Sequence, residues 1–175
     1  MILMHNSYDF LKNNNLTRSY KYDVGYDIKS PYTTTINPGA SEIIDTGLHV
    51  SMHEYVFGII KSRSGIAIKC SCECSNGGVI DPGYTGSINV KIYNYSNNAQ
   101  IIIKKEDRFC QMVLCLSPEG FLRKISHQRN WEAFLCLINS LDLTIQEQDM
   151  ETWPQTERGE KGVGSTGTGF SSLSN

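Results

Sequence analysis

The apolar residues of the chain fall in short runs that are separated by polar turns, and this pattern predicts a succession of β-strands. We expect strands at 24–28, 43–44, 48–50, 55–60, 79–80, 88–94, 101–104 and 109–116. Glycine, proline or asparagine stands between most of these runs, for example in the turn region at 33–40 and the Asn-rich turn at 96–98. Many short strands at regular spacing are typical of an all-β barrel or sandwich, including the jelly roll.

Residues 121–150 break this rhythm. Apolar residues recur there at the spacing of one face of a helix, and we expect a helix near 126–142. The residues on that face are Trp131, Phe134, Leu135, Ile138 and Leu141. From Thr156 onward the chain is rich in Gly, Ser and Thr, a composition that cannot form a core. The predicted organisation is a single β domain over 1–155 with an atypical insert at 121–150, followed by a flexible arm at 156–175.

Composition limits the classes of partner. At 175 residues, the chain is long enough for one domain with a real core. Its formal net charge of -2 gives no electrostatic support for nucleic-acid binding. No apolar run approaches the roughly 18–20 residues that span a bilayer, and residues 1–15 lack the apolar block of a signal peptide. We therefore expect an intracellular protein with no membrane partner, whose thiols are reduced.

Three of the six cysteines alternate along a possible strand, which would place the thiols of Cys70, Cys72 and Cys74 on one side. A zinc site usually needs a fourth ligand and a C-x₂₋₄-C spacing. We therefore expect packed, reduced thiols in preference to a zinc site. The four histidines form no ligand-like cluster along the sequence, so we assign them no function.

A glycine-framed turn at 77–86 presents one acid and one aromatic ring, Asp81 and Tyr84. Pro82-Gly83 is a strong turn signal, and the surrounding glycines allow a ligand to approach the backbone. The segment is therefore a candidate site, although an ordinary hairpin turn is an alternative interpretation.

Two further segments combine cations, hydroxyls and glycines in a way that suits anion binding. The first, Arg158 to Gly167, interleaves glycines with Ser, Thr, Lys and Arg, so that backbone N–H groups and a cation could converge on a phosphate. The second, Ser62 to Gly65, follows a predicted strand and precedes a possible short helix. Each signal is weak alone, because mobile termini and ordinary turns share these compositions.

Five segments occur in an order that resembles all five motifs of the homotrimeric dUTPase family. The segments are Val24–Ile28, Arg63–Gly65, Gly78–Asp81 with Tyr84 and Gly86, Asp107-Arg108 with Gln111, and Arg158–Gly167. Together they cover most of the chain. The resemblance implies a distorted, jelly-roll-like β-barrel that forms a homotrimer, with each active site shared by three chains. One chain would contribute Asp27, Arg63 and 107–111, a second the central turn, and a third the C-terminal arm.

The resemblance also implies the reaction, which is hydrolysis of dUTP to dUMP and pyrophosphate with Mg²⁺. Such a reaction excludes uracil from DNA and supplies dUMP. Asp81 would be the catalytic residue, which orients the water that attacks the α-phosphorus. Tyr84 would pack against the deoxyribose and exclude a 2′-hydroxyl, while the backbone near Gly78 and Asn89 would bind the uracil edge. Asp27 would face the metal, through water, or would mainly fix local structure.

The remaining implied roles concern the phosphates and the closing arm. The implied substrate-binding residues of this group are Arg63, Ser64, Gly65, Gln111, Arg158, Val163, Gly164, Ser165 and Thr166. One of them departs from the family, because an aromatic residue usually stands at the position of Val163 and stacks on the base. We therefore predict that Val163→Phe tightens substrate binding or raises turnover, which steady-state kinetics would measure. Phe170 is an alternative residue whose aromatic ring would stack on the base.

Two other functions remain open at this point. The dCTP deaminases share the expected fold and a similar turn. They differ at two positions: they carry a catalytic glutamate where this chain has Lys91, and an arginine at a position near Ile68 of this chain. A lysine cannot activate water as a carboxylate does, so deamination is disfavoured. A dUTPase that also binds a protein partner through residues 121–150 is the second alternative, since that interval is longer than the family needs.

Overall fold

The chain is predominantly β-structured in the computed structural model, which describes residues 2–12, 15–117 and 145–161. The strands are β1 (Ile2–Asn6), β2 (Gly25–Lys29), β3 (Thr34–Ile36), β4 (Ser41–Asp45), β5 (Leu48–Ser51), β6 (Val56–Ser62), β7 (Cys72–Ser75), β8 (Asn89–Asn94), β9 (Ile101–Ile103), β10 (Arg108–Leu116) and β11 (Ile145–Glu147). The helices are α1 (Ser64–Cys70) and the short 3₁₀ turns η1 (Asp9–Leu11) and η2 (Met150–Thr152). No helix of the described segments is long and apolar enough to cross a bilayer.

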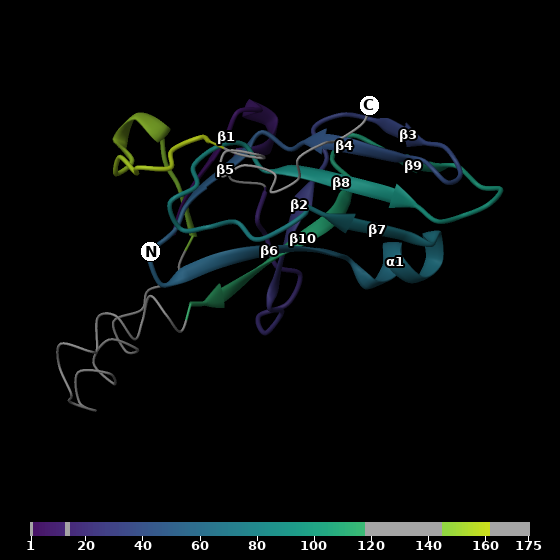
Figure 1. Ribbon diagram of the computed structural model, residues 1–175, viewed down its shortest axis with the longest axis horizontal. Coiled ribbons are helices and arrows are strands. Elements are labelled where there is room, and N and C mark those ends of the chain that lie inside the picture. Colours follow the sequence, from purple (N-terminus) through teal and green to yellow (C-terminus); the bar gives the residue numbers. More distant parts are fainter. Residues whose placement is uncertain (1, 13–14, 118–144, 162–175) are drawn as a thin grey trace, which may run out of the picture.

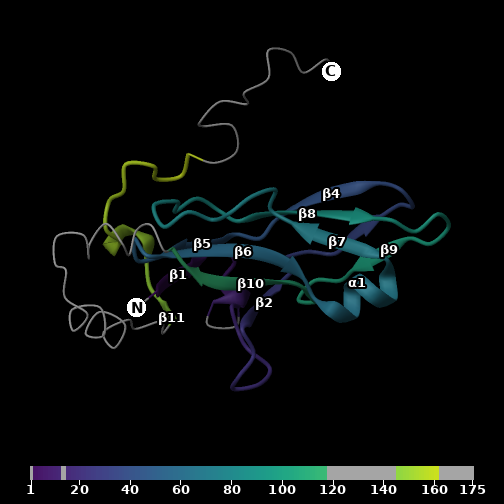
Figure 2. The same cartoon turned by 60° about the horizontal axis from the view of Figure 1, so that its bottom comes forward.

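The strands form four small sheets, with the orders β11-β1-β5, β2-β10-β6, β3-β9 and β4-β8-β7. Every pairing between these strands is antiparallel except that of β1 with β11, which is parallel. The sheet β4-β8-β7 lies along one side of β6 and β10 (Figures 1 and 2). The arrangement is jelly-roll-like, as predicted, but the strands do not close into a barrel.

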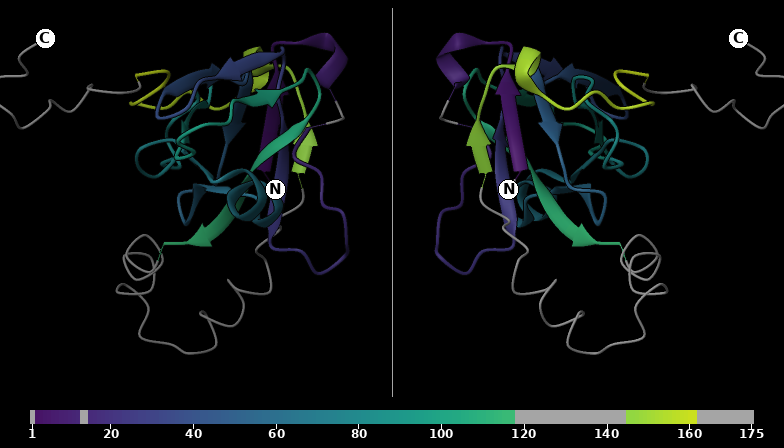
Figure 3. Two further views of the ribbon diagram at one scale, coloured as in Figure 1. Left: turned by 90° about the vertical axis from the view of Figure 1, so that its right-hand side faces the viewer. Right: turned by 90° about the vertical axis from the view of Figure 1, so that its left-hand side faces the viewer.

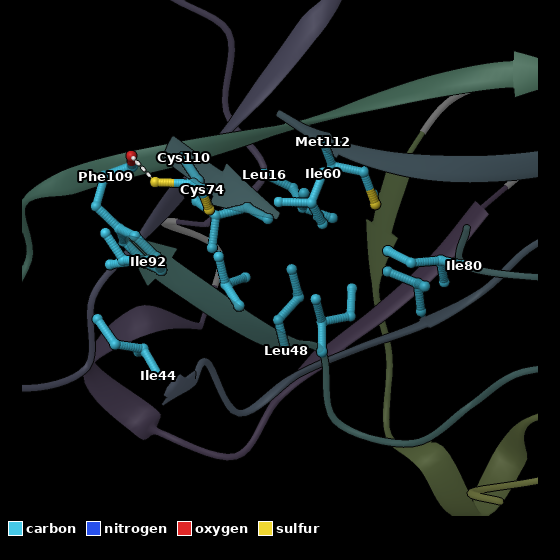
Figure 4. Packing of buried hydrophobic residues seen from close by; sticks show 14 of the residues in the cluster. Leu16, Ile44, Leu48, Ile60, Cys74, Ile80, Ile92, Phe109, Cys110 and Met112 are labelled. Atoms are coloured by element: carbon cyan, nitrogen blue, oxygen red, sulfur yellow. Dashed lines mark hydrogen bonds between the residues drawn. The ribbon is translucent and has the colours of Figure 1, made fainter. Parts of the chain in front are cut away.

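The alternation of apolar and polar residues produces one interior between the sheets. Along β8, Val90, Ile92 and Asn94 are buried, while the residues between them are exposed. Side chains from β4, β6, β8 and β10 point into the same interior, as Ile44, Ile60, Ile92 and Met112 show in Figure 4. Full burial of one such aliphatic side chain stabilises a fold by about 1.5–3 kcal/mol. This packed interior supports the turn at 77–86.

Strands at 25–29, 41–45, 48–51, 56–62, 89–94, 101–103 and 108–116 confirm the predicted runs to within a few residues. The prediction at 79–80 is wrong, because only Ile80 makes a bridge, with Gly58. No strand was predicted at Ile2–Asn6, but this segment is β1, paired with β5 and β11 (Figure 3). β3 lies inside a region expected to be a turn. Both omissions have one cause: short strands are stabilised by partners distant in sequence.

The three cysteines do not share one strand. Cys70 ends α1 and is exposed, whereas Cys72 and Cys74 lie on β7 and are buried. The Cys74 thiol donates to the Phe109 carbonyl at 3.4 Å. Burial raises the pKa of Cys110 far above its usual range, so this thiol is unreactive in the folded chain.

The end of the interval 121–150 belongs to the sheet β11-β1-β5, since Ile145, Gln146 and Glu147 pair with β1. The helix expected near 126–142 lies outside the described residues. The strand and the short helix predicted on either side of Ser62–Gly65 are present, because β6 ends at Ser62 and α1 begins at Ser64.

Candidate functional site

The turn that carries Asp81 is clamped by backbone hydrogen bonds on both sides. Ile80 exchanges two bonds with Gly58, at 2.8 and 2.9 Å, and the Ile88 N–H donates to the Leu48 carbonyl at 2.8 Å. Within the turn, the Tyr84 N–H donates to the Asp81 carbonyl at 3.0 Å across Pro82-Gly83. The structure therefore holds the acid on a rigid bend, as the sequence predicted.

The Tyr84 ring folds over its own turn, and this conformation requires glycine at position 86. A Cβ at Gly86 would lie 2.6 Å from the Tyr84 hydroxyl oxygen, which is too close for any other residue without a shift. The Tyr84 hydroxyl donates to the Ser87 carbonyl at 2.7 Å. Burial, with smaller contributions from Asp45 and Glu160, raises the pKa of Tyr84. The phenol is therefore a neutral group with a fixed ring.

A cavity of about 620 Å³ opens beside this turn. We call it the hairpin cavity, and its lining includes His49, residues 76–80, Tyr84, residues 86–89, Arg158 and Glu160. Gly78, Tyr84, Asn89 and Arg158 were predicted as site residues and all lie here. Asp81 stands at its edge, between the lining residues Ile80 and Tyr84. Because Gly77 and Gly78 have no side chains, part of the wall is backbone.

The beginning of the C-terminal arm lies on this same turn. The Arg158 guanidinium pairs with the Asp81 carboxylate and stands 5.6 Å from the centre of the Tyr84 ring. The Thr156 hydroxyl donates to the Gly83 carbonyl at 2.6 Å, and the Thr85 N–H donates to the Gly159 carbonyl at 2.9 Å. The arm was expected to serve another chain, but in this single chain its first residues contact their own hairpin. Val163, Gly164, Ser165 and Thr166 lie outside the described residues.

A second cavity, of about 390 Å³, lies where β6 passes into α1. We call it the helix cavity. The predicted residues Asp27, Arg63, Ser64, Gly65 and Gln111 all line it, together with Ser19, Asp23, Val24, Gly25, Ile66 and Lys69. Of the predicted site residues that the structure describes, none lines both cavities.

Asp27 is the centre of a charge network at this second cavity. Its carboxylate is paired with Arg63 Nε at 2.7 Å and with an Arg108 guanidinium nitrogen at 3.2 Å, and Asp27 is only 6% exposed. Arg63 also donates to the Arg108 carbonyl at 3.0 Å. Both Asp27 oxygens therefore face cations. Asp27 and Arg63 fix the local structure in this arrangement, which was one of the two roles expected for Asp27.

The chain's own residues do not fit a resident Mg²⁺ at this position. Mg²⁺ requires oxygen ligands with nearly octahedral geometry, but both oxygens of Asp27 are engaged by guanidinium groups. Within residues 2–12, 15–117 and 145–161, no group of three His, Cys, Asp or Glu side chains could hold a metal ion.

Gln111 is placed by close contact with glycine. Its side-chain amide donates to the Ser62 carbonyl at 3.0 Å. A Cβ at Gly25 would lie 1.9 Å from Gln111 Oε1, so a larger residue at 25 must displace Gln111. β10 carries Gln111 between β2 and β6, which explains how residues from three distant segments reach one cavity.

The lining residues that sequence reasoning did not assign include His49 and Asn76 in the hairpin cavity and Lys69 in the helix cavity. No local signal could have found His49, because its place depends on how β5 packs against the turn. Lys69 follows Ser64 in the same short helix and was within reach of sequence reasoning. Among the described residues that line this cavity, it is the only cation besides Arg63, whose charge is already paired with Asp27.

A family model described as dUTPase matches residues 12–135, which is more than half of the chain. The chain therefore belongs to the dUTPase family. Its fold, its glycine-framed turn and its two cavities are those of a member of this family. This result confirms the resemblance found in the five sequence motifs.

Known relatives agree with the assignment. A deoxyuridine 5′-triphosphate nucleotidohydrolase of Rabbitpox virus is 32% identical over 151 residues, which cover 86% of this chain and 84% of the relative. A mutant dUTPase from phage phi11 of S. aureus resembles the structure with a TM-score of 0.59 at 23% identity, over 66% of this chain and 90% of that one. A Staphylococcus bacteriophage 80alpha dUTPase mutant with dUpNHpp resembles the structure with a TM-score of 0.58 at 25% identity, over 66% of this chain and 85% of that one.

Proposed function

We propose that this protein hydrolyses dUTP to dUMP and pyrophosphate. Family membership and the activity in the name of the Rabbitpox relative support the reaction. The observation that carries the proposal is a single rigid carboxylate, Asp81, at the edge of a cavity with a partly backbone wall and a fixed aromatic ring. Such a cavity suits a flat base and a sugar, with the acid beside the α-phosphate.

In the proposed mechanism, Asp81 accepts a proton from the water that attacks the α-phosphorus. The bond between that phosphorus and the bridging oxygen breaks, and pyrophosphate leaves. Positioning and proton acceptance by one side chain typically accelerate a reaction by about 10²–10⁴-fold. The acid is suited to this role because the clamped turn keeps it in one place.

Arg158 pairs with Oδ2 of Asp81, and its departure would free this oxygen for the attacking water. The side chains of this pair are 34% and 42% exposed, and an exposed ion pair stabilises a fold by only about 0.2–1 kcal/mol. A triphosphate offers the guanidinium a more highly charged partner with bidentate geometry. We therefore propose that substrate binding transfers Arg158 from Asp81 to the phosphates, which frees the base in the same step.

Base and sugar selection would follow from the wall of the hairpin cavity. The backbone near Gly78 and Asn89 would bind the uracil edge, and a closely fitted wall leaves no room for the thymine methyl group. A cytosine amino group would leave buried polar groups unpaired, which is costly. Tyr84 would cover the deoxyribose, so a ribose 2′-hydroxyl would clash with a ring that Gly86 and Ser87 hold in place.

The phosphates would extend into the helix cavity of a neighbouring chain, and this requires a homotrimer with shared sites. Ser64, Gly65 and Gln111 would donate to phosphate oxygens there, with Lys69 as the unneutralised cation. The separation of the predicted residues into two cavities of one chain supports this arrangement, since neither cavity holds both Asp81 and the phosphate-binding group. Magnesium would enter bound to the triphosphate, as part of the substrate, because the described residues offer it no cage.

The direct test is a substrate panel. Purified protein with Mg²⁺ is expected to release pyrophosphate from dUTP, and much less from dCTP, dTTP or UTP. Ammonia release from dCTP would instead support a deaminase. Lys91 is exposed on β8 and offers no carboxylate for that reaction. An absence of pyrophosphate release from dUTP would contradict the proposal.

Mixing two inactive variants tests whether the sites are shared. Asp81→Asn lacks the base, and Ser64→Asp places a negative charge against the phosphates. When the two variants are unfolded and refolded together, sites that combine an intact hairpin with an intact helix cavity should recover activity. Recovery no greater than the sum of the separate refolded variants would show that one chain supplies both groups.

A further inference from the structure

His49 connects the N-terminal strand region to the hairpin that carries Asp81 and Tyr84. It lies on β5, is 9% exposed, and lines the hairpin cavity. Its Nδ1 stands 2.9 Å from the Thr85 carbonyl oxygen, and its Nε2 stands 3.1 Å from the Ser7 hydroxyl. Neither the family motifs nor the proposed chemistry uses this residue.

The partners determine where the ring protons lie. A carbonyl oxygen can only accept, so Nδ1 carries a hydrogen and donates to Thr85. When the ring is neutral, Nε2 is the acceptor and the Ser7 hydroxyl donates to it. Ser7 itself is fixed, because its N–H donates to the Gly47 carbonyl at 2.8 Å. The Thr85 carbonyl therefore selects this tautomer, and the Ser7 hydroxyl, which can donate or accept, adds a second hydrogen bond that holds the ring.

Thr85 is the residue through which this bond would act. It directly follows Tyr84, and its N–H donates to the Gly159 carbonyl of the arm. The Ser87 hydroxyl, which donates to the Asp45 carboxylate, holds the next part of the loop. His49 thus fixes the residue that joins the Tyr84 ring to the arm carrying Arg158.

We propose that His49 is a positioning residue that sets the Tyr84–Thr85 backbone and thereby the preference for deoxyribose. This inference rests on the proposed dUTP hydrolysis and adds a determinant of sugar selection. Loss of the Nδ1 hydrogen bond would release the Thr85 carbonyl and let the Tyr84 ring move away from its place over Gly86. A 2′-hydroxyl would then be tolerated, while Asp81, clamped through Ile80, would remain in position.

The test compares His49→Leu, which removes the donor, with His49→Asn, whose side-chain amide can place an N–H near the position of Nδ1. For each folded variant, kcat and KM are measured with dUTP and with UTP. His49→Leu is expected to reduce the dUTP-over-UTP ratio of kcat/KM by about tenfold, the size typical of one lost hydrogen bond to a partly buried carbonyl. His49→Asn should restore most of the ratio. The matched control is His53→Leu, since His53 is exposed and stacks on Tyr55, and the ratio should not change.

A purely structural role would lower the melting temperature of His49→Leu but leave the ratio unchanged in the folded fraction, and that result overturns the proposal. Equal ratios for His49→Leu and His49→Asn would also overturn it. If His49→Leu does not fold, Ser7→Ala decides the question: it should lower the ratio by a smaller factor, about twofold to threefold, and an unchanged ratio contradicts the proposal.

A second measurement separates this proposal from the proposed function. Amide hydrogen exchange in residues 83–87 is expected to accelerate in His49→Leu relative to wild type, whether or not the protein hydrolyses dUTP. If wild type is inactive on dUTP, the proposed function fails, and the sugar-selection role fails with it. Unchanged exchange in an active enzyme overturns the positioning role alone.

Discussion

An aspartate–arginine pair lies in or at the edge of each cavity, but the two pairs differ in burial and in what holds them. At the helix cavity, Asp27 has a side chain that is 8% exposed and meets two arginines, Arg63 at the start of α1 and Arg108 on β10. At the hairpin cavity, Asp81 has a side chain that is 42% exposed and meets one arginine from the arm. The same chemistry therefore serves two purposes. The buried network fixes a scaffold, while the exposed pair can be exchanged for a ligand.

The expected free energies explain this difference. Removing a buried carboxylate that accepts hydrogen bonds from partly exposed arginines typically costs about 1.5–3 kcal/mol, because hydrogen bonds to a charged group are lost. Opening an exposed pair costs about 0.2–1 kcal/mol. A charged substrate can readily provide the second amount. Substitutions in the two cavities should therefore separate stability from catalysis, and the following predictions test this from the largest effect to the smallest.

Asp81→Asn should lower kcat by about 10²–10⁴-fold, because the amide cannot accept the proton of the attacking water. The free energy of unfolding should change by less than about 1 kcal/mol, since only an exposed pair is lost. Pyrophosphate release and urea denaturation measure the two effects. Turnover at the wild-type rate would remove Asp81 from the mechanism.

Asp27→Asn should have the opposite profile, with a loss of about 1.5–3 kcal/mol in the free energy of unfolding, the size of a hydrogen bond to a charged group, because Arg63 and Arg108 lose their carboxylate partner but are themselves 30% and 45% exposed. The Mg²⁺ concentration for half-maximal activity should not change in the folded variant. Asp9→Asn is the control, because Asp9 pairs with Lys12 at 2.9 Å but its side chain is 91% exposed. If Asp27→Asn were stable but required much more Mg²⁺, Asp27 would be a metal-facing residue after all.

Gly25→Ala should raise KM for dUTP severalfold by displacing Gln111, with an overpacking cost of about 1–3 kcal/mol in stability. A Cβ at Gly65, on the rim of the same cavity, meets nothing within 4 Å. Gly65→Ala should therefore lack this stability loss, and thermal unfolding of the two variants gives the comparison. Equal stability of both would show that Gln111 moves aside without cost.

Arg158→Gln should leave the free energy of unfolding within about 1 kcal/mol of wild type and raise KM for dUTP, because the arm loses its charge for the phosphates. Binding of dUMP, which lacks the terminal phosphates, should weaken less. Isothermal titration with dUMP and with a non-hydrolysable dUTP analogue measures the contrast. Equal weakening for both ligands would mean that Arg158 acts on the base or sugar.

Much of this architecture was readable from local patterns. The apolar alternation at 89–94 and 108–116 predicted the strands, and Pro82-Gly83 predicted the bend that presents Asp81. The ordered motifs predicted the family. These features depend on residues close together in the chain, where periodicity and turn chemistry act directly.

Only the tertiary structure decided the roles that depend on distant partners. It joined Ile2–Asn6 to β5 and β11, enclosed Asp27 between Arg63 and Arg108, and placed His49 against Thr85. A single carboxylate has the same sequence signature whether it faces guanidinium groups or an open cavity. Burial and the identity of the neighbours determine its energetic role, and both depend on strand pairings between residues far apart in the chain.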